Sequence, residues 1–131
     1  MKSKLLRNAG KVLLPVARKA AENAYCPYSG IRVGAAVLAA SGNVYSGCNI
    51  ENASYGLTNC AERVAVQHAV AAGERKLLAV AIFSPDIKAI TPCGACRQVL
   101  AEFSGPGTLV FLGSGRKRKL SELLPESFAL K

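Results

Sequence analysis

Apolar residues near the start of the chain recur every three or four positions between Leu5 and Ala24. This spacing places them on one face of an amphipathic helix. Pro15 lies inside the run and lacks an amide hydrogen, so we expect it to kink the helix or to divide it in two. The proline and glycine within residues 26–30 are expected to end the helix.

Two short apolar segments that follow are typical of a β-hairpin. We expect strands at residues 31–40 and 44–48, joined by a turn at residues 41–43. Residues 49–59 are polar and predict a loop. The two strands are therefore expected to pair with each other.

The rest of the chain alternates between helical and strand patterns. In chain order we expect a helix at 59–72, a strand at 77–83, a helix at 93–103, a strand at 108–112, a short basic strand at 116–120 and a helical turn at 120–124. This alternation implies parallel crossovers, with helices on both faces of one sheet. The turn at residues 113–115 is too short for a parallel crossover, so the last two strands are expected to be antiparallel. The predicted fold class is α/β with a mixed five-stranded sheet.

The composition supports one globular domain. The chain has 131 residues, of which 50% are hydrophobic and 19% are charged, a balance that argues against disorder. We expect a single domain spanning residues 1–131. The five cysteines are an odd number, and the sequence shows neither a signal-peptide pattern nor an apolar run long enough for a bilayer. Reduced thiols in the cytoplasm are therefore expected, with no membrane partner.

The chain carries a formal net charge of +9, part of it in residues 116–119 and part near the N-terminus. Positive charge attracts nucleic acid, but no aromatic residues interleave with the basic run and no nucleic-acid motif accompanies it. We therefore interpret the charge as a solvated face and an exposed hairpin arm. Nucleic acid is not expected as a partner.

Three cysteines and one glutamate carry the candidate chemistry: Cys60, Glu62, Cys93 and Cys96. Three thiolates can hold a zinc ion and leave its fourth position open, as catalytic zinc sites do. Glu62 lies two residues from a ligand, where a carboxylate can exchange protons with water. The pattern indicates metal-assisted hydrolysis.

Helix starts favour the thiolate forms of these cysteines. Cys60 and Cys93 lie at or near predicted helix starts, where partial positive charge lowers a thiol pKa. Cys96 lies one turn beyond Cys93, so both sulfurs face one side of that helix. Arg63 is the first candidate for offsetting the thiolate charge, and Arg97 is the second.

Other interpretations of the cysteines remain open. Cys26 or Cys48 could close a structural site as a fourth ligand, or the cysteines could be buried apolar residues without a metal. Cys26 and Cys48 are otherwise expected to pack in the interior. His68, the single histidine, is expected to be a packing or surface residue.

Specific stretches surround these cysteines and extend over nearly the whole chain. They are Tyr25-Cys26-Pro27-Tyr28-Ser29, Val33-Gly34-Ala35-Ala36, Gly47-Cys48-Asn49-Ile50-Glu51-Asn52-Ala53, Cys60-Ala61-Glu62-Arg63, Pro92-Cys93-Gly94-Ala95-Cys96-Arg97-Gln98-Val99 and Glu122-Leu123-Leu124-Pro125. The zinc-deaminase signature places Pro-Cys-x-x-Cys after a first ligand and its glutamate. With these stretches the chain resembles the small, homotetrameric, zinc-dependent cytidine deaminases. Their three-layer α/β/α fold is then expected here.

The resemblance implies hydrolysis of cytidine and 2′-deoxycytidine to uridine products, with release of ammonia and a role in pyrimidine salvage. One zinc ion per chain would be held by Cys60, Cys93 and Cys96. Glu62 would take a proton from the attacking water and deliver protons to ring N3 and the leaving amine. The amide of Ala61 would bind the base.

The resemblance also assigns residues beyond the cluster. Asn49 and Glu51 match positions that hydrogen-bond the ribose hydroxyls, and Arg63 matches the residue that neutralises thiolate charge. Tyr55 matches a residue that reaches into a neighbour's site, and Phe128 matches a C-terminal aromatic that closes over the base from another subunit. Without the resemblance, Asn49 and Glu51 fit a solvated turn, and Tyr55 and Phe128 fit ordinary partly buried rings.

One segment departs from the family. Ile31 and Arg32 stand where the family commonly has a phenylalanine followed by proline or another residue. Stacking of an aromatic ring contributes about 0.5–1.5 kcal/mol beyond the area it buries. The aliphatic Ile31 therefore predicts a roomier pocket and some tolerance of modified cytosine nucleosides.

Two rival functions follow from the same residues. A related deaminase could act on another cyclic amidine such as the antibiotic blasticidin S, which would not require the ribose contacts of Asn49 and Glu51. A zinc-stabilised nucleic-acid-binding module could instead use the basic C-terminal strand, and it would be indifferent to loss of Glu62.

Overall fold

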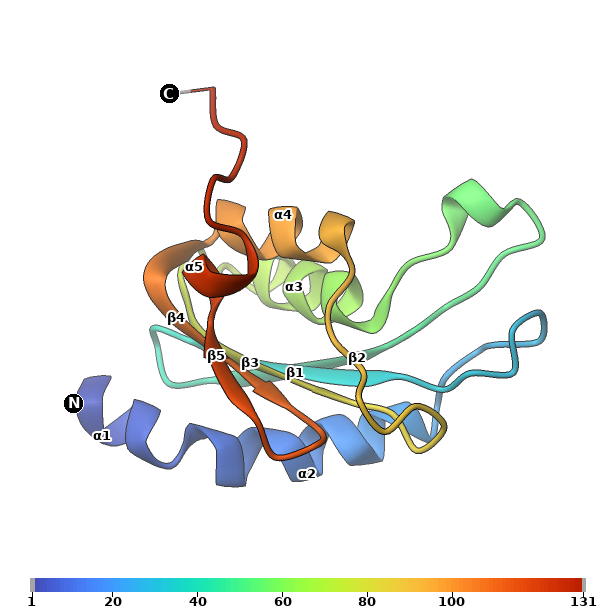
Figure 1. Cartoon of the computed structure of the whole chain (residues 1–131), viewed down its shortest axis with the longest axis horizontal. Coiled ribbons are helices and arrows are strands. Elements are labelled where there is room, and N and C mark those ends of the chain that lie inside the picture. Colours follow the sequence, from blue (N-terminus) through green and yellow to red (C-terminus); the bar gives the residue numbers. More distant parts are fainter. Residues whose placement is uncertain (1, 131) are drawn as a thin grey trace.

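A mixed five-stranded sheet organises the chain, and the structure, a computed structural model, describes residues 2–130. The strands are β1 Gly34–Ala39, β2 Val44–Cys48, β3 Leu77–Phe83, β4 Ser104–Leu112 and β5 Lys117–Lys119. The helices are α1 Lys2–Arg7, α2 Ala9–Ala21, α3 Ala61–Ala71, α4 Gly94–Glu102 and α5 Leu120–Leu123, with a 3-10 turn, η1, at Tyr55–Leu57. Helices α1 and α2 cover one face of the sheet, and α3 and α4 cover the other (Figure 1). The predicted α/β/α layering is confirmed.

The strand order β2-β1-β3-β4-β5 confirms the predicted crossovers. β1 is antiparallel to both β2 and β3, so β2 and β3 run in the same direction and α3 connects them across β1. β3 and β4 are parallel and α4 connects them. β4 and β5 are antiparallel, as the short turn between them predicted.

Alternate side chains of the central strands pack into two cores. On β1, Ala35, Val37 and Ala39 face the core beneath α3 and α4, whereas Ala36 and Leu38 face the core beneath α2. All six residues of β1 are buried. Because many of these residues are alanines, the helices can lie close to the sheet.

Helix and strand ends differ from the sequence predictions at several points. The first helix is divided at Asn8 rather than at Pro15, which lies inside α2, and α2 ends at Ala21. Burial of Leu13 and Ala17 on either side of Pro15 outweighs the hydrogen bond that the proline lacks.

Residues 105–107, which lie between the helix predicted to end at 103 and the strand predicted to begin at 108, belong to β4. The register shifts there, because Leu77 pairs with Ser104 while Ala79 pairs with Leu109. Such a bulge lets a strand absorb extra residues. At the other end of the sheet β1 begins only at Gly34, so residues 31–33 lie outside the strand.

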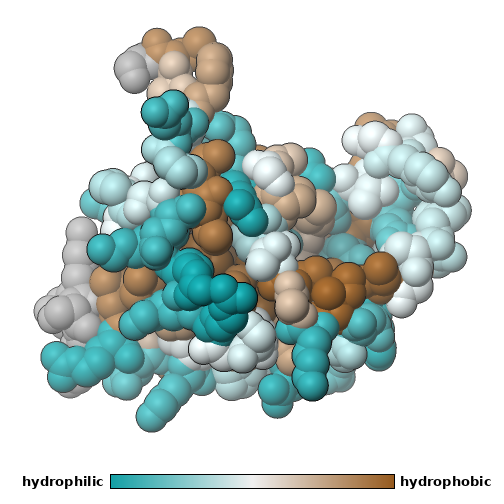
Figure 2. Space-filling view, in the orientation of Figure 1, coloured by the Kyte–Doolittle hydropathy of each residue, from teal (hydrophilic) through white to brown (hydrophobic). Residues whose placement is uncertain are grey.

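The basic run lies on the edge strand. Lys117 and Lys119 are exposed and Arg118 is half-buried. Hydrophilic residues gather over the β4–β5 hairpin (Figure 2). Within residues 2–130, none of the helices has the length and apolar character needed to span a bilayer.

The first turn of α3 lies directly against β2 at Gly47. A methyl group there would collide with the amide nitrogen of Ala65 and would lie 2.8 Å from the carbonyl oxygen of Ala61. Only glycine therefore allows this helix to approach the sheet so closely. The contact sets the position of Cys60, the residue just before α3.

Gly47→Ala is expected to lower the free energy of unfolding by about 1–3 kcal/mol, because backbone atoms of α3 must move away from β2. Gly56→Ala is the matched control, since its added methyl group meets no atom within 4 Å. Urea unfolding followed by circular dichroism measures both variants. Equal stability of the two variants would contradict the proposed role of this contact.

Candidate active site

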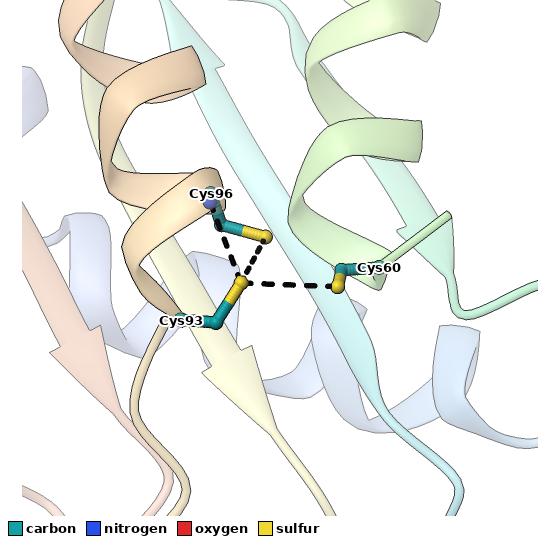
Figure 3. Close-up of side chains that lie close together, drawn as sticks. All are labelled: Cys60, Cys93 and Cys96. Carbon is teal, nitrogen blue, oxygen red and sulfur yellow. Dashed lines mark hydrogen bonds between the residues drawn. The ribbon is translucent and has the colours of Figure 1, made fainter. Parts of the chain in front are cut away.

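Three cysteine sulfurs converge where two helices begin. Cys60 immediately precedes α3, Cys93 immediately precedes α4, and Cys96 lies in the first turn of α4. The sulfur–sulfur distance is 4.0 Å between Cys60 and Cys93 and 3.4 Å between Cys93 and Cys96 (Figure 3). All three sulfurs lie within 4.8 Å of one another, an arrangement that could hold a metal ion.

The donor set fits zinc. A tetrahedral site with zinc–sulfur bonds of about 2.3 Å has sulfur–sulfur separations of about 3.8 Å. The observed distances of 4.0 Å and 3.4 Å bracket that value. Among residues 2–130, the group contains these three cysteines and neither Cys26 nor Cys48. The geometry therefore favours the three-ligand interpretation over a closed four-cysteine site.

The electrostatics of the cluster favour a thiolate at Cys60. Hydrogen bonding from Cys96, together with Arg63, lowers the pKa of Cys60 to about 5 despite partial burial. The pKa of Cys96 is raised, because its sulfur lies beside Cys60 and is buried. These contacts favour the thiolate form of Cys60, which is the form that binds a metal ion.

Arg63 supplies the compensating positive charge. Its Nη2 donates to Cys60 Sγ at 3.6 Å and to the carbonyl oxygen of Thr58 at 3.2 Å. Arg97, the second candidate, has other contacts: its Nε donates to the carbonyl of Pro92 at 2.8 Å and its Nη1 to that of Leu123 at 2.8 Å. Arg97 therefore ties down the segment before Cys93 instead of contacting a sulfur.

Glu62 lies in the first turn of α3 and is 4% exposed. Burial raises the pKa of its carboxyl group to about 7. A group with a pKa near neutrality can both accept and donate a proton under physiological conditions. Its place beside Cys60 gives the site a proton carrier next to the candidate metal position.

A pocket of about 270 Å³ opens onto Cys60, Cys93 and Glu62. It also contains four other residues that the sequence predicted for the site, Ile31, Asn49, Glu51 and Ala61. The sequence missed Ser29, Val33, Thr58, Ile90 and Thr91, which line the same pocket. A signal existed for two of them, because Ile90 and Thr91 immediately precede Pro92-Cys93.

Asn49 and Glu51 have hydrogen-bond partners within the chain. Asn49 Nδ2 donates to the carbonyl of Ile31 at 2.8 Å, and its Oδ1 accepts from the amide of Val33 at 2.9 Å. Glu51 accepts from the amides of Tyr28 and Ser29 at 2.9 Å and 3.1 Å and from the Ser29 hydroxyl. The hydrogen bond from Ser29 lowers the pKa of Glu51, so this carboxylate is anionic at neutral pH.

Tyr55 and Phe128 lie outside this pocket. Tyr55 is 74% exposed and its ring packs edge-on against Tyr28 at 5.8 Å between centroids. Phe128 is 71% exposed, and its backbone exchanges two hydrogen bonds with the side chain of Gln98, at 3.0 Å and 3.2 Å. The structure does not bring either ring to the cysteine cluster of its own chain.

Comparison with known proteins identifies the family. A family model described as the cytidine and deoxycytidylate deaminase zinc-binding region matches residues 8–112. A cytidine deaminase from Halalkalibacterium halodurans is 48% identical over 122 residues, covering 90% of this chain and 92% of that protein. One from Sporosarcina psychrophila is 46% identical, with 89% of each chain covered.

Solved structures agree with the sequence comparisons. The crystal structure of cytidine deaminase from Mycobacterium tuberculosis superposes with a TM-score of 0.84 at 45% identity, covering 92% of this chain and 97% of that one. The chain belongs to the zinc-binding cytidine deaminase family. The predicted resemblance, the enzyme class and the zinc cofactor are confirmed at the level of the family.

Substitution of one cluster cysteine tests the metal site. Cys96→Ala is expected to reduce bound zinc from about one ion per chain to a small fraction, because two sulfurs hold the ion poorly. Cys48→Ala removes a cysteine outside the cluster and is expected to retain zinc. Metal content measured by mass spectrometry after gel filtration distinguishes the two. Loss of zinc from both variants alike would count against the three-cysteine site.

Proposed function

We propose that the chain catalyses the hydrolytic deamination of cytidine and 2′-deoxycytidine to the uridine products. The observation that carries the proposal is the buried Glu62 beside three converging sulfurs, in a pocket that Glu62 lines together with Cys60 and Cys93. The relatives from Halalkalibacterium halodurans and Sporosarcina psychrophila, both named cytidine deaminase, support the choice of substrate. The reaction belongs to pyrimidine salvage, and five free thiols suit a reducing cytoplasm.

Zinc held by Cys60, Cys93 and Cys96 would act as a Lewis acid that makes water nucleophilic near neutral pH. Glu62 takes a proton from the attacking water and delivers it to ring N3. The water oxygen bonds to C4, and Glu62 then carries the remaining proton of that oxygen to the amine. The C4–nitrogen bond breaks as ammonia leaves, and C4 becomes the carbonyl carbon of the uridine product. The amide of Ala61, at the start of α3, donates a hydrogen bond that orients the base.

Residues next to the cysteine cluster neutralise its charge and bind the sugar. Arg63 offsets the negative charge of three thiolates through its contact with Cys60. Asn49 and Glu51 line the pocket and contact the ribose hydroxyls, using the second amide hydrogen of Asn49 and the remaining lone pairs of Glu51. This recognition of ribose favours a nucleoside over an antibiotic such as blasticidin S.

We further propose that residues 1–131 form one domain and that four copies assemble. The five strands of one sheet support the single domain. Tyr55 and Phe128 are exposed aromatic rings outside the pocket of their own chain, and large exposed apolar groups mark interaction surfaces. In the homotetramer these two rings complete the pocket of a neighbouring copy.

Glu62→Gln is expected to lower kcat for cytidine by at least about a hundredfold, because the amide cannot carry protons. The variant is expected to keep its zinc and its fold, since glutamine has nearly the same shape. Glu74→Gln is the matched control, because Glu74 follows the end of α3 opposite Cys60 and accepts hydrogen bonds from Ser41 and Tyr45. Ammonia release and the ultraviolet change of cytidine measure turnover. Normal turnover by Glu62→Gln would exclude the proposed mechanism and leave a binding module as the better description.

The side chain of Ile31 is expected to determine how well the pocket accepts nucleosides with a modified cytosine base. Among residues 2–130, those lining this pocket include no aromatic side chain. Ile31→Phe is expected to raise kcat/KM for cytidine roughly two- to tenfold through stacking. It should lower kcat/KM for N4-methylcytidine, because the ring narrows the pocket. Strong preference of the native protein for plain cytidine, together with no effect of Ile31→Phe, would refute this role.

A further inference from the structure

Two segments outside the sheet, residues 29–33 and residues 84–91, line the pocket. They leave the same end of the sheet, because Gly34 at the start of β1 pairs with Phe83 at the end of β3. The side chains that they contribute are Ser29, Ile31, Val33, Ile90 and Thr91. The width of the pocket therefore depends on how these two segments are held together.

The backbone of residues 31–33 is held by five hydrogen bonds to side chains and by one to the backbone amide of Asn49. Every backbone N–H and C=O of residues 31–33 is in a hydrogen bond, although the segment belongs to no strand. Asn49 takes three of them, the carbonyls of Ile31 and Val33 and the amide of Val33. The amide of Ile31 donates to a nearby serine hydroxyl. The remaining two groups belong to Arg32 and bind the second segment.

Arg32 is connected to the second segment by its side chain and by its backbone. The Asp86 carboxylate accepts from the Arg32 amide at 2.8 Å, from its Nε at 3.1 Å and from its Nη2 at 2.9 Å. The Ser84 hydroxyl donates to the Arg32 carbonyl at 2.6 Å. The same hydroxyl accepts from the amides of Asp86 and Ile87, both at 3.1 Å. The two segments are thus connected at one residue by four hydrogen bonds.

The side chain of Arg32 lies outside the pocket. Ile31 and Val33 line the pocket, and extended backbone points alternate side chains to opposite sides. Arg32 is not among the lining residues, and its side chain is 50% exposed. Its guanidinium lowers the pKa of Asp86 to about 2, so Asp86 remains an anionic acceptor at neutral pH. Any effect of this pair on substrate must therefore act through the lining residues.

We infer that Arg32, Asp86 and Ser84 form a clamp that fixes the separation of Ile31 and Ile90 and thereby sets the affinity for the nucleoside base. This inference rests on the proposed function, because it assumes that the pocket binds a base. The clamp residues are positioning residues and do not contact substrate. The clamp acts on binding, since Cys60 and Glu62 are placed by α3, Cys96 lies within α4, and Arg97 separately holds Pro92, the residue before Cys93.

Graded substitutions test the clamp through KM. Arg32→Met removes the guanidinium contacts and leaves the backbone contact, so KM for cytidine should rise roughly two- to fivefold. Asp86→Ala removes all three contacts and should raise KM roughly five- to twentyfold. In both variants kcat should stay within about twofold of the native value. The double variant should resemble Asp86→Ala, because the side chain of Arg32 then has no partner left to lose.

Arg75→Met is the matched control for loss of an exposed guanidinium. Arg75 contacts the carbonyls of Val70 and Glu74 at the end of α3, and its substitution should leave KM unchanged. A native KM in Asp86→Ala, or a fall in kcat without a change in KM, would overturn the clamp. Equal rises in KM for Arg32→Met and Arg75→Met would overturn it as well.

Hydrogen exchange separates failure of the clamp from failure of the proposed function. In Asp86→Ala, peptides covering residues 29–33 and 84–91 should exchange faster, while peptides from β3 should be unchanged. If the native chain turned over no cytidine, the proposed function would fail, yet this measurement would still decide whether the two segments are clamped. Native exchange in both segments would overturn the clamp whatever the activity. Arg32→Met supplies the same test should Asp86→Ala fail to fold.

Discussion

The meeting of two helix starts at one end of the sheet is the constraint on which the site depends. β2 and β3 run in the same direction because both are antiparallel to β1, so the helices that follow them begin at the same end. Cys60 and Cys93 occupy those two starts, where partial positive charge favours thiolates. Glu62 lies in the first turn of α3. The topology of three strands therefore brings the cluster together before any metal is considered.

The cluster could be predicted from the sequence because its geometry is mostly local. Cys60 and Glu62 lie within one helical turn, as do Cys93 and Cys96, so their spacing alone places each pair together near a helix start. The alternation of helix and strand patterns likewise predicted the mixed sheet. The pattern did not predict correctly where individual helices and strands end. The helix passes through Pro15 because burial on the sheet outweighs a lost hydrogen bond.

The pocket walls were harder to predict because long-range contacts make them. Ile90 and Thr91 meet residues that lie almost sixty positions earlier in the chain, and no periodicity reports such a contact. Asn49 and Glu51 were expected to contact a sugar, and the structure shows that their side chains also hold residues 28–33 in place. A sequence pattern identifies a polar position, whereas the fold decides which backbone groups that position must satisfy.

The way in which residues 31–33 are held has a consequence for how specificity could change. The groups that fix this backbone come from Ser29, Asn49, Ser84 and Asp86, while the side chains facing the pocket are Ile31 and Val33. The hydrogen bonds that hold the backbone of residues 31–33 thus involve different atoms from the side chains that face the pocket. Selection, or a protein engineer, can exchange the inward-facing side chains while the main chain keeps its path, so this short stretch is a place where new substrate ranges could evolve without loss of fold.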